Sequence, residues 1–299
     1  MPDTNSTKPK RSGLILKKTE KAEAGKKLGL GRQLLIQLFL LAIAFIVIYP
    51  LLWIFGLSID SRNISRPVEL TLIPKNASFQ AYSDVIERPT ANPVSFWQLA
   101  FNSFRLALGT SAASVLIGVL AAYAFARFRF TGRQILMIMV LTVLMLPSIA
   151  TLPALFVLLN KIVLGGFNLR NSLLGVGFAM LSGMLPFAIW NLKGYLDTIP
   201  KELEEAALID GCNTNQAFFK IILPLAVPVL AVTAFLGFMS GWTEFAISWQ
   251  FLTNPKDFTL TMALFNMIGQ YAAGTPWSKF AAYSIMVALP VSVVYLFLQ

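Results

Sequence analysis

The chain contains no histidine and a single cysteine, Cys212, and only 13% of its 299 residues are charged. Without histidine, a histidine-dependent metal site or a Ser-His-Asp triad is impossible, and one cysteine excludes a disulfide within the chain. So little charge, beside 56% hydrophobic residues and a mean hydropathy of +0.68, excludes an ordinary soluble domain, because such a domain needs a solvated polar surface. These values are typical of an integral membrane protein.

A phosphate-binding, glycine-rich loop is also missing. The pattern G-x-x-x-x-G-K-[ST] does not occur, and the nearest stretch, residues 29–32, lacks the lysine and the hydroxyl residue. If the chain takes part in ATP-driven transport, another chain therefore binds the ATP and Mg²⁺. No paired carboxylates and no nucleophile with a base occur at membrane depth, so an integral-membrane enzyme is disfavoured. We expect no catalytic residue, no metal site and no cofactor in this chain.

Long charge-free windows run through the sequence. A bilayer core about 30 Å thick needs roughly 20 apolar residues in a helix. Six windows predict six transmembrane helices in an all-α, polytopic protein: 33–59, 106–126, 134–160, 171–192, 221–243 and 280–299. A seventh window, 258–278, holds polar and helix-breaking residues that are expensive to dehydrate, so we expect an extramembrane loop with a short helix at its start. Pro147 and Pro153 are expected to bend the third span.

Lysine and arginine are distributed unevenly over the predicted loops. With six spans both termini lie on one side of the membrane, and that side collects fifteen basic residues against nine on the other. The excess predicts that both termini are cytoplasmic. Residues 1–32 are basic and lack a signal-peptide cleavage site, and we expect a disordered cytoplasmic tail. The net charge of +10 does not indicate nucleic acid, since no basic groove with interleaved aromatic residues appears.

The predicted cytoplasmic loop 191–224 has the local features of two short helices. Pro200 suits a first helical turn, the acidic residues after it suit the positive helix end, and Asp210-Gly211 ends a helix of about ten residues. Either member of the pair Asn213-Thr214 can then cap a second helix. On periodicity alone, this loop is equally well an ordinary surface hairpin that is solvated on its acidic side.

A longer pattern runs through the same loop: Glu205-Ala206-Ala207, Asp210-Gly211, Phe218, and finally Ile221-x-Leu223-Pro224. In order and spacing it resembles the EAA loop of ABC-importer membrane subunits, with one departure at Cys212, where the family commonly has alanine. The resemblance implies the type I ABC importer fold and a cytoplasmic coupling hairpin that docks in a cleft on the ATPase. It also implies which residues couple to the ATPase: Glu205, Ala206, Ala207, Asp210, Gly211, Phe218, Ile221, Leu223 and Pro224.

The likeness covers roughly residues 34–299 and includes Asn102-Ser103, residues 122–127 and residues 193–195. It is nearest the carbohydrate-uptake group and, within it, the maltose/maltodextrin importers, whose membrane subunits each form half of the translocation path. The resemblance implies the following partners: a second, MalF-like membrane subunit in a heterodimer, two ATPase subunits, an extracellular or periplasmic sugar-binding protein, the sugar substrate, and the lipid bilayer of a bacterial-type cytoplasmic (inner) membrane.

Two further groups of residues are candidates, the first of them by this resemblance. A segment of the second outer loop is expected to enter the binding protein and displace its sugar: Gly269, Gln270, Tyr271, Ala272, Ala273, Gly274 and Thr275. The same stretch also suits an ordinary flexible loop. Glu244 follows the fifth span and, with Trp242, is a candidate for the translocation path. The alternative makes Glu244 an interfacial helix-end carboxylate and Trp242 part of the aromatic belt.

The predicted organisation is a tail, 1–32, and a permease domain, 33–299, with outer loops at about 60–104 and 248–279 and the coupling loop at 191–224. The rival interpretation is a self-sufficient secondary transporter or channel. That class needs an intramembrane charge or a broken helix near the midplane, and two related halves. The six windows hold no charge at their centres, and no inverted repeat is found.

Overall fold

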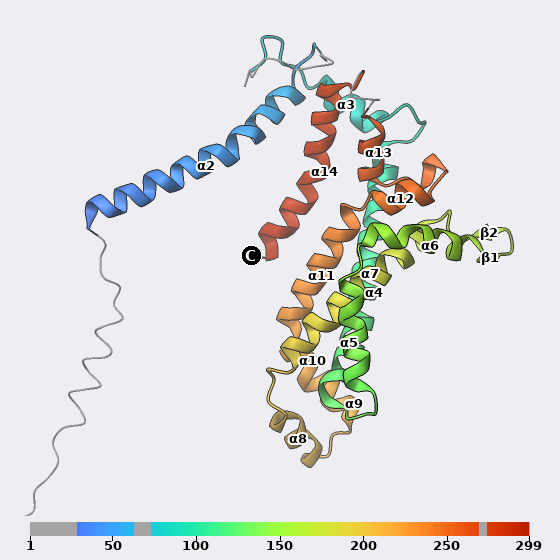
Figure 1. The fold of residues 1–299 in the computed structure, drawn as a ribbon. Coiled ribbons are helices and arrows are strands. Elements are labelled where there is room, and N and C mark those ends of the chain that lie inside the picture. Colours follow the sequence, from blue (N-terminus) through green and yellow to red (C-terminus); the bar gives the residue numbers. More distant parts are fainter. Residues whose placement is uncertain (1–28, 63–72, 269–273, 299) are drawn as a thin grey trace, which may run out of the picture. The chain divides into compact units, whose positions relative to one another are not determined.

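The computed structural model describes residues 29–62, 73–268 and 274–298. The chain divides into two compact units, Met1–Leu52 and Trp53–Gln299, and helix α2 (Leu30–Ser58) begins in the first and ends in the second. The larger unit is a helical bundle (Figure 1). Its longer helices are α4 (Phe96–Arg127), α5 (Arg133–Leu144), α6 (Ser148–Asn160), α7 (Leu173–Leu196), α11 (Val227–Trp242) and α14 (Trp277–Leu298). Its shorter helices are α3 (Gln80–Glu87), α8 (Glu202–Ile209), α9 (Thr214–Ala217), η1 (Phe218–Ile222), α10 (Leu223–Leu225), α12 (Ala246–Phe251), η2 (Pro255–Asp257) and α13 (Leu260–Asn266).

Four helices of the described chain are long and apolar enough to cross a membrane: α2, α4, α7 and α14. Two further pairs are bent at a short break, α5 with α6 by 106° and the helical segment Thr214–Leu225 with α11 by 73°. The span count reaches six, as the sequence predicts, when each bent pair is one span. The break in the first pair falls directly before α6, whose N-cap residue is Pro147. Pro153 lies inside α6.

Helix α4 begins earlier than expected. It starts at Phe96, inside the range 60–104 that the sequence assigns to an outer loop, because Ser95 caps it by accepting a hydrogen bond from the Gln98 amide at 3.4 Å. The predicted span begins only at residue 106, because the window was required to be free of charge and Arg105 precedes it. That guanidinium lies 5.5 Å from the Phe101 ring centre on the helix surface, so the charge does not interrupt the helix.

The second outer loop is more structured than a plain connection. It holds α12, η2 and α13, and α13 confirms the short helix expected at the start of window 258–278. Leu260 and Ala263 on α13 are buried, and the Tyr283 hydroxyl of α14 donates to the Leu260 carbonyl at 2.9 Å. The all-α class is confirmed, and the described chain adds one short hairpin in which β1 (Val163–Leu164) pairs antiparallel with β2 (Phe167–Asn168).

The bundle is organised around α4, which packs along both α7 and α11. Glycines make the closest approaches. A Cβ built at Gly241 of α11 would lie 2.5 Å from the Ala107 Cα of α4, and one built at Gly118 of α4 would lie 3.2 Å from the Ala188 Cβ of α7. Small residues at helix contacts are typical of membrane bundles, because association there depends on close packing rather than on expulsion of water.

Gly241→Ala is expected to destabilise the contact between α4 and α11, since the new Cβ would lie 2.5 Å from Ala107 Cα and 2.8 Å from Thr110 Oγ1. Overpacking of this kind costs about 1–3 kcal/mol and should lower the thermal unfolding midpoint of the protein in detergent. The matched control is Gly109→Ala on α4, whose Cβ would meet nothing within 4 Å. Equal midpoints for the two variants would contradict the close approach.

Candidate functional site

The segment between α7 and α11 forms a hairpin of short helices at one end of the larger unit (Figure 1). Helix α8 carries Glu202, Glu204 and Glu205 in its first turn, where the helix dipole favours negative charge. It ends at Asp210, and Gly211 follows with φ +91°, a left-handed conformation that favours glycine. The predicted helix end at Asp210-Gly211 is confirmed.

The second arm of the hairpin begins with a capping box. The Asn213 side chain accepts a hydrogen bond from the Gln216 amide and the Gln216 side chain accepts one from the Asn213 amide, each at 2.9 Å. Of the two caps that the sequence allows, the structure uses Asn213. Helix α9 continues into the π turn η1, directly before Pro224 in α10, which has no N–H to donate.

A buried ion pair joins this hairpin to the end of α4. The Arg127 Nε donates to Glu204 Oε2 at 2.9 Å, and Arg127 Nη2 donates to the Ile199 carbonyl at 3.0 Å. The other carboxylate oxygen of Glu204 is hydrogen-bonded to the Tyr123 hydroxyl. The side chains of Arg127 and Glu204 are 6% and 11% exposed, so both charges are withdrawn from solvent. Such a pair persists only when its hydrogen-bonding groups are satisfied.

Aromatic packing reinforces the same junction. The Phe218 ring, which belongs to the EAA-like pattern, lies 4.6 Å from the Tyr123 ring, centre to centre. Both side chains belong to a cluster of buried residues that also contains Leu192 and Leu196 of α7 and Ile222 of η1. The hairpin is therefore fixed against α4 and α7 by apolar contacts as well as by charge.

The remaining surface of α8 faces outward. Ile209 is 87% exposed, and Leu208, Glu205 and Ala206 are also exposed. Ala207 is buried within this chain instead. The exposed side of α8 is both apolar and acidic, while its opposite side is fixed to α4. An exposed apolar patch of this kind is typical of a protein–protein contact surface. Of the other residues in the pattern, the structure exposes Asp210, Gly211 and Pro224 and partly buries Ile221 and Leu223.

The sequence did not reveal Glu204, Tyr123 and Arg127 as parts of this site. Glu204 precedes the EAA-like pattern by one residue, and its neighbour Glu205 carries the resemblance. Charge offered a signal, because Arg127 directly follows a predicted span and is the first cation after it. Only the fold brings the two charges together across 77 residues of sequence.

The two candidates for the translocation path have structural contacts of their own. The Trp242 side chain is buried, donates from Nε1 to the Val287 carbonyl of α14 at 3.0 Å and stacks on Phe238, so it packs inside the bundle. The Glu244 carboxylate accepts from the amides of Ile247 at 2.6 Å and Ser248 at 3.1 Å. It thus binds amides of the first turn of α12, as a helix-end carboxylate, and also lines a cavity of about 700 Å³ between α6, α7 and α12.

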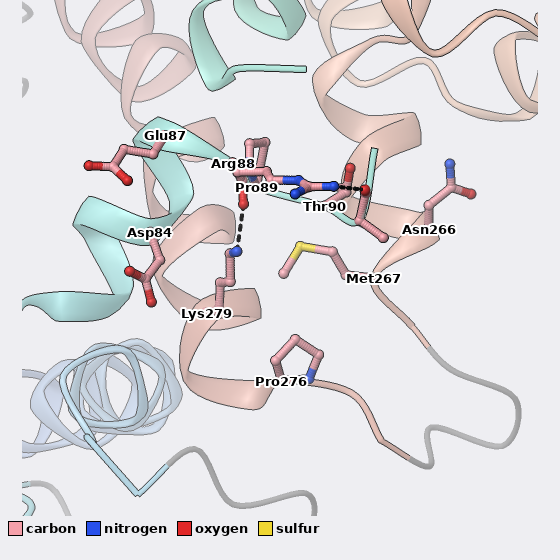
Figure 2. A pocket seen from close by; sticks show the side chains of 10 residues that line it. Asp84, Glu87, Arg88, Pro89, Thr90, Asn266, Met267, Pro276 and Lys279 are labelled. Atoms are coloured by element: carbon pink, nitrogen blue, oxygen red, sulfur yellow. Dashed lines mark hydrogen bonds between the residues drawn. The ribbon is translucent and has the colours of Figure 1, made fainter. Parts of the chain in front are cut away.

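Of the predicted sugar-displacing segment, Gly269, Gln270, Tyr271, Ala272 and Ala273 lie outside the described residues. Gly274 has φ +71° and Thr275 is buried. Next to them, a polar pocket of about 510 Å³ opens between α3, the end of α13 and the start of α14 (Figure 2). Asp84 and Lys279 line it, and Lys279 Nζ donates to the Arg88 carbonyl at 2.6 Å. This pocket offers charges of both signs to a polar partner.

Comparison with known proteins identifies the family. Residues 114–299 match the family described as the binding-protein-dependent transport system inner membrane component. The chain belongs to this family. Among its relatives, the galactooligosaccharides transport system permease protein GanQ of Bacillus subtilis is 35% identical, with 90% of this chain and 91% of the relative covered. The maltose/maltodextrin transport system permease protein MalG of Escherichia coli is 33% identical, with 89% and 90% covered.

The fold comparison agrees with the family. A bacterial ABC transporter involved in the import of the acidic polysaccharide alginate matches with a TM-score of 0.71 at 22% identity, covering 92% of this chain and 99% of that chain. The resemblance to ABC-importer membrane subunits is thereby confirmed at the level of family and fold. The rival interpretation, a self-sufficient secondary transporter or channel, is not supported, because the family that the chain belongs to is described as a component of binding-protein-dependent transport systems.

Two adjacent glutamates on α8 provide a matched test of the buried ion pair. Glu204→Ala leaves the Arg127 cation buried without its carboxylate, so we expect a loss of roughly 3–5 kcal/mol in unfolding free energy. Glu205→Ala removes the same atoms from an exposed side chain and should change it by less than about 0.5 kcal/mol. Thermal unfolding of the purified variants, with protease cleavage of the hairpin as the readout, measures the change in each variant. A comparable loss in the two variants would refute the burial of Glu204.

Proposed function

We propose that this chain is the membrane subunit of an ATP-driven, binding-protein-dependent sugar importer and that its hairpin transmits the motion of an ATPase. One observation carries the proposal: α8 presents exposed Glu205, Ala206 and Ile209 while Glu204 ties the same helix to α4. A contact surface of this kind transmits force only if it cannot move independently of the bundle. The EAA-like pattern on the exposed side supports an ATPase as the partner.

The assembly we propose contains this chain, a second, MalF-like membrane subunit, two ATPase subunits that bind ATP and Mg²⁺, and an external sugar-binding protein. ATP closes the ATPase dimer, and the docked hairpin moves as a rigid body. The spans then tilt from an inward-facing to an outward-facing arrangement while the loaded binding protein sits on the outer side. This chain forms half of the translocation path in the inner membrane and performs no chemistry.

The substrate we propose is a neutral oligosaccharide such as a maltodextrin or a galactooligosaccharide. The names of the relatives GanQ and MalG support this class. A cavity of about 490 Å³ between α4, α7 and α11 supports it as well: its lining includes the hydroxyls of Ser114, Thr233, Ser240 and Thr243, and the described residues around it carry no charge. Hydroxyl groups without a fixed charge suit an uncharged ligand rich in hydroxyls.

Glu205→Lys tests the coupling role. The side chain is exposed on α8, so membrane insertion and thermal stability should stay near the wild-type level. Charge reversal on the docking surface should release the ATPase subunits or abolish ATP-driven uptake, because like charges across an interface cost several kcal/mol. Co-purification of the ATPase and sugar uptake into vesicles measure the two effects.

The matched control is Lys75→Glu, a charge reversal of the same size at an exposed residue in the loop that follows α2. It should retain both the ATPase and the uptake. Wild-type uptake in Glu205→Lys, with the ATPase still bound, would remove the hairpin from the coupling mechanism.

The substrate class is tested with the complete importer in proteoliposomes. Maltodextrins and galactooligosaccharides, added with the binding protein, should stimulate ATP hydrolysis, and an acidic oligosaccharide of matched length should not. Calorimetry on the isolated binding protein should rank the three ligands in the same order. Stimulation by the acidic oligosaccharide alone would overturn the proposed substrate class.

A further inference from the structure

Helix α4 is held at both of its ends by buried side chains. It runs for 32 residues, about 48 Å at 1.5 Å per residue, and its sequence contains no proline. The other long helices α2, α7 and α14 contain Pro50, Pro186 and Pro290, respectively. Because proline removes a helical hydrogen bond and favours bending, α4 lacks the feature by which the other long helices of the described chain can bend.

At the hairpin end, α4 is attached by the ion pair of Arg127 with Glu204. The guanidinium also donates to the Ile199 carbonyl, before α8 begins. One side chain of α4 therefore holds both the entrance to α8 and its first turn. A guanidinium with two fixed acceptors leaves the hairpin little freedom to rotate against α4.

At the other end, two consecutive residues of α4 attach the helix by hydrogen bonds. Both donor hydrogens of the Asn102 amide are used, since Nδ2 donates to the Lys256 carbonyl at 2.7 Å and to the Phe258 carbonyl at 3.0 Å. The Ser103 hydroxyl accepts from the Leu260 amide at 2.8 Å. Asn102 is 2% exposed and Ser103 is fully buried. These bonds hold the segment 256–260 between α12 and α13.

Contacts along the middle of α4 keep neighbouring helices in register with it. The Ser111 hydroxyl donates to the Ala234 carbonyl of α11 at 2.6 Å, close to the contact of Gly241 with Ala107. A displacement of either end of α4 therefore moves the whole helix together with α11, since packed helices interlock and do not slide freely.

We propose that α4 is a rigid link between the coupling hairpin and the outer segment 256–260, and that Arg127 and Asn102 are the positioning residues that attach its ends. The inference rests on the proposed coupling role of the hairpin. When the ATPase moves the hairpin, α4 displaces the outer segment. By thermodynamic reciprocity, a binding protein that contacts the outer segment changes the equilibrium position of the hairpin. The two sites communicate through one element whose position both of them bias.

A double-mutant cycle across α4 tests this link in the complete importer. Arg127→Lys keeps a cation for Glu204 but lacks the planar fork that reaches the Ile199 carbonyl as well. Asn102→Ala removes both bonds to the outer segment. Each variant should lower the stimulation of ATP hydrolysis by loaded binding protein about fivefold or more, with all subunits still co-purifying. The double variant should be no worse than the more impaired of the two single variants, because either change breaks the link and the stimulation that remains passes through other contacts.

Distant sites that act independently give additive free energies. If the two effects on stimulation multiply, or if neither single variant reduces it, the proposed link is wrong. Two controls break weaker contacts near the same ends: Gln98→Ala removes an exposed 3.4 Å bond to the Lys256 carbonyl, and Asp197→Ala removes the surface ion pair with Lys193. Both controls should retain stimulation.

A second measurement does not depend on activity. In a Cys212→Ala background, a spin label at Thr253→Cys, close to the outer segment, should change its mobility when ATP is added. Arg127→Lys should abolish that change if α4 carries the motion, and an unaltered change would overturn the link. Suppose that Glu205→Lys stops uptake while the effects of Arg127→Lys and Asn102→Ala on stimulation are additive in free energy. The coupling role of the hairpin then stands, and the role of α4 as a link is wrong.

Discussion

The buried ion pair between Arg127 and Glu204 is the interaction on which the functional part of this structure depends. Withdrawing two charges from solvent is expensive, and their attraction compensates only when the remaining hydrogen-bonding atoms also find partners. Tyr123 and the Ile199 carbonyl supply those partners. The pair adds little stability compared with an apolar contact of the same size. What it provides is a defined orientation, because the guanidinium donates to its partners in one plane and at fixed angles.

The bundle above this junction is built from contacts that suit a membrane. Large apolar side chains such as Leu116, Phe178 and Val232 are exposed on α4, α7 and α11, as expected where lipid or another subunit covers the surface. Lipid tails are as apolar as these side chains, so helices gain little by burying them against one another. Glycines such as Gly118 and Gly241 bring the backbones together instead, and their dispersion contacts and short polar bonds hold the helices.

The ends of the bundle are organised by buried polar groups in addition to apolar packing. At one end Arg127 binds the hairpin; at the other Asn102 and Ser103 bind the segment before α13. A buried amide or guanidinium that donates to two fixed acceptors has one good geometry, whereas an apolar contact tolerates many. Polar groups therefore fix the positions of the loops, and the apolar helices between them supply stiffness. This division of roles suits a subunit that passes movement between partners on opposite sides of a membrane.

Composition and spacing determined the class of this protein, its helical windows and its family. Transfer of long apolar stretches into a bilayer is a local property of each stretch, and the EAA-like pattern with its caps at Gly211 and Asn213 is read along one short segment. The start of α4 was misplaced because a charge such as Arg105 does not end a helix that exposes it on one side. Only the tertiary structure decided that Glu204 rather than Glu205 faces inward, that Trp242 packs inside the bundle, and that Asn102 meets the segment before α13. These outcomes depend on which side chains distant segments bring together, and helical periodicity alone does not say which side of a helix the rest of the chain will cover.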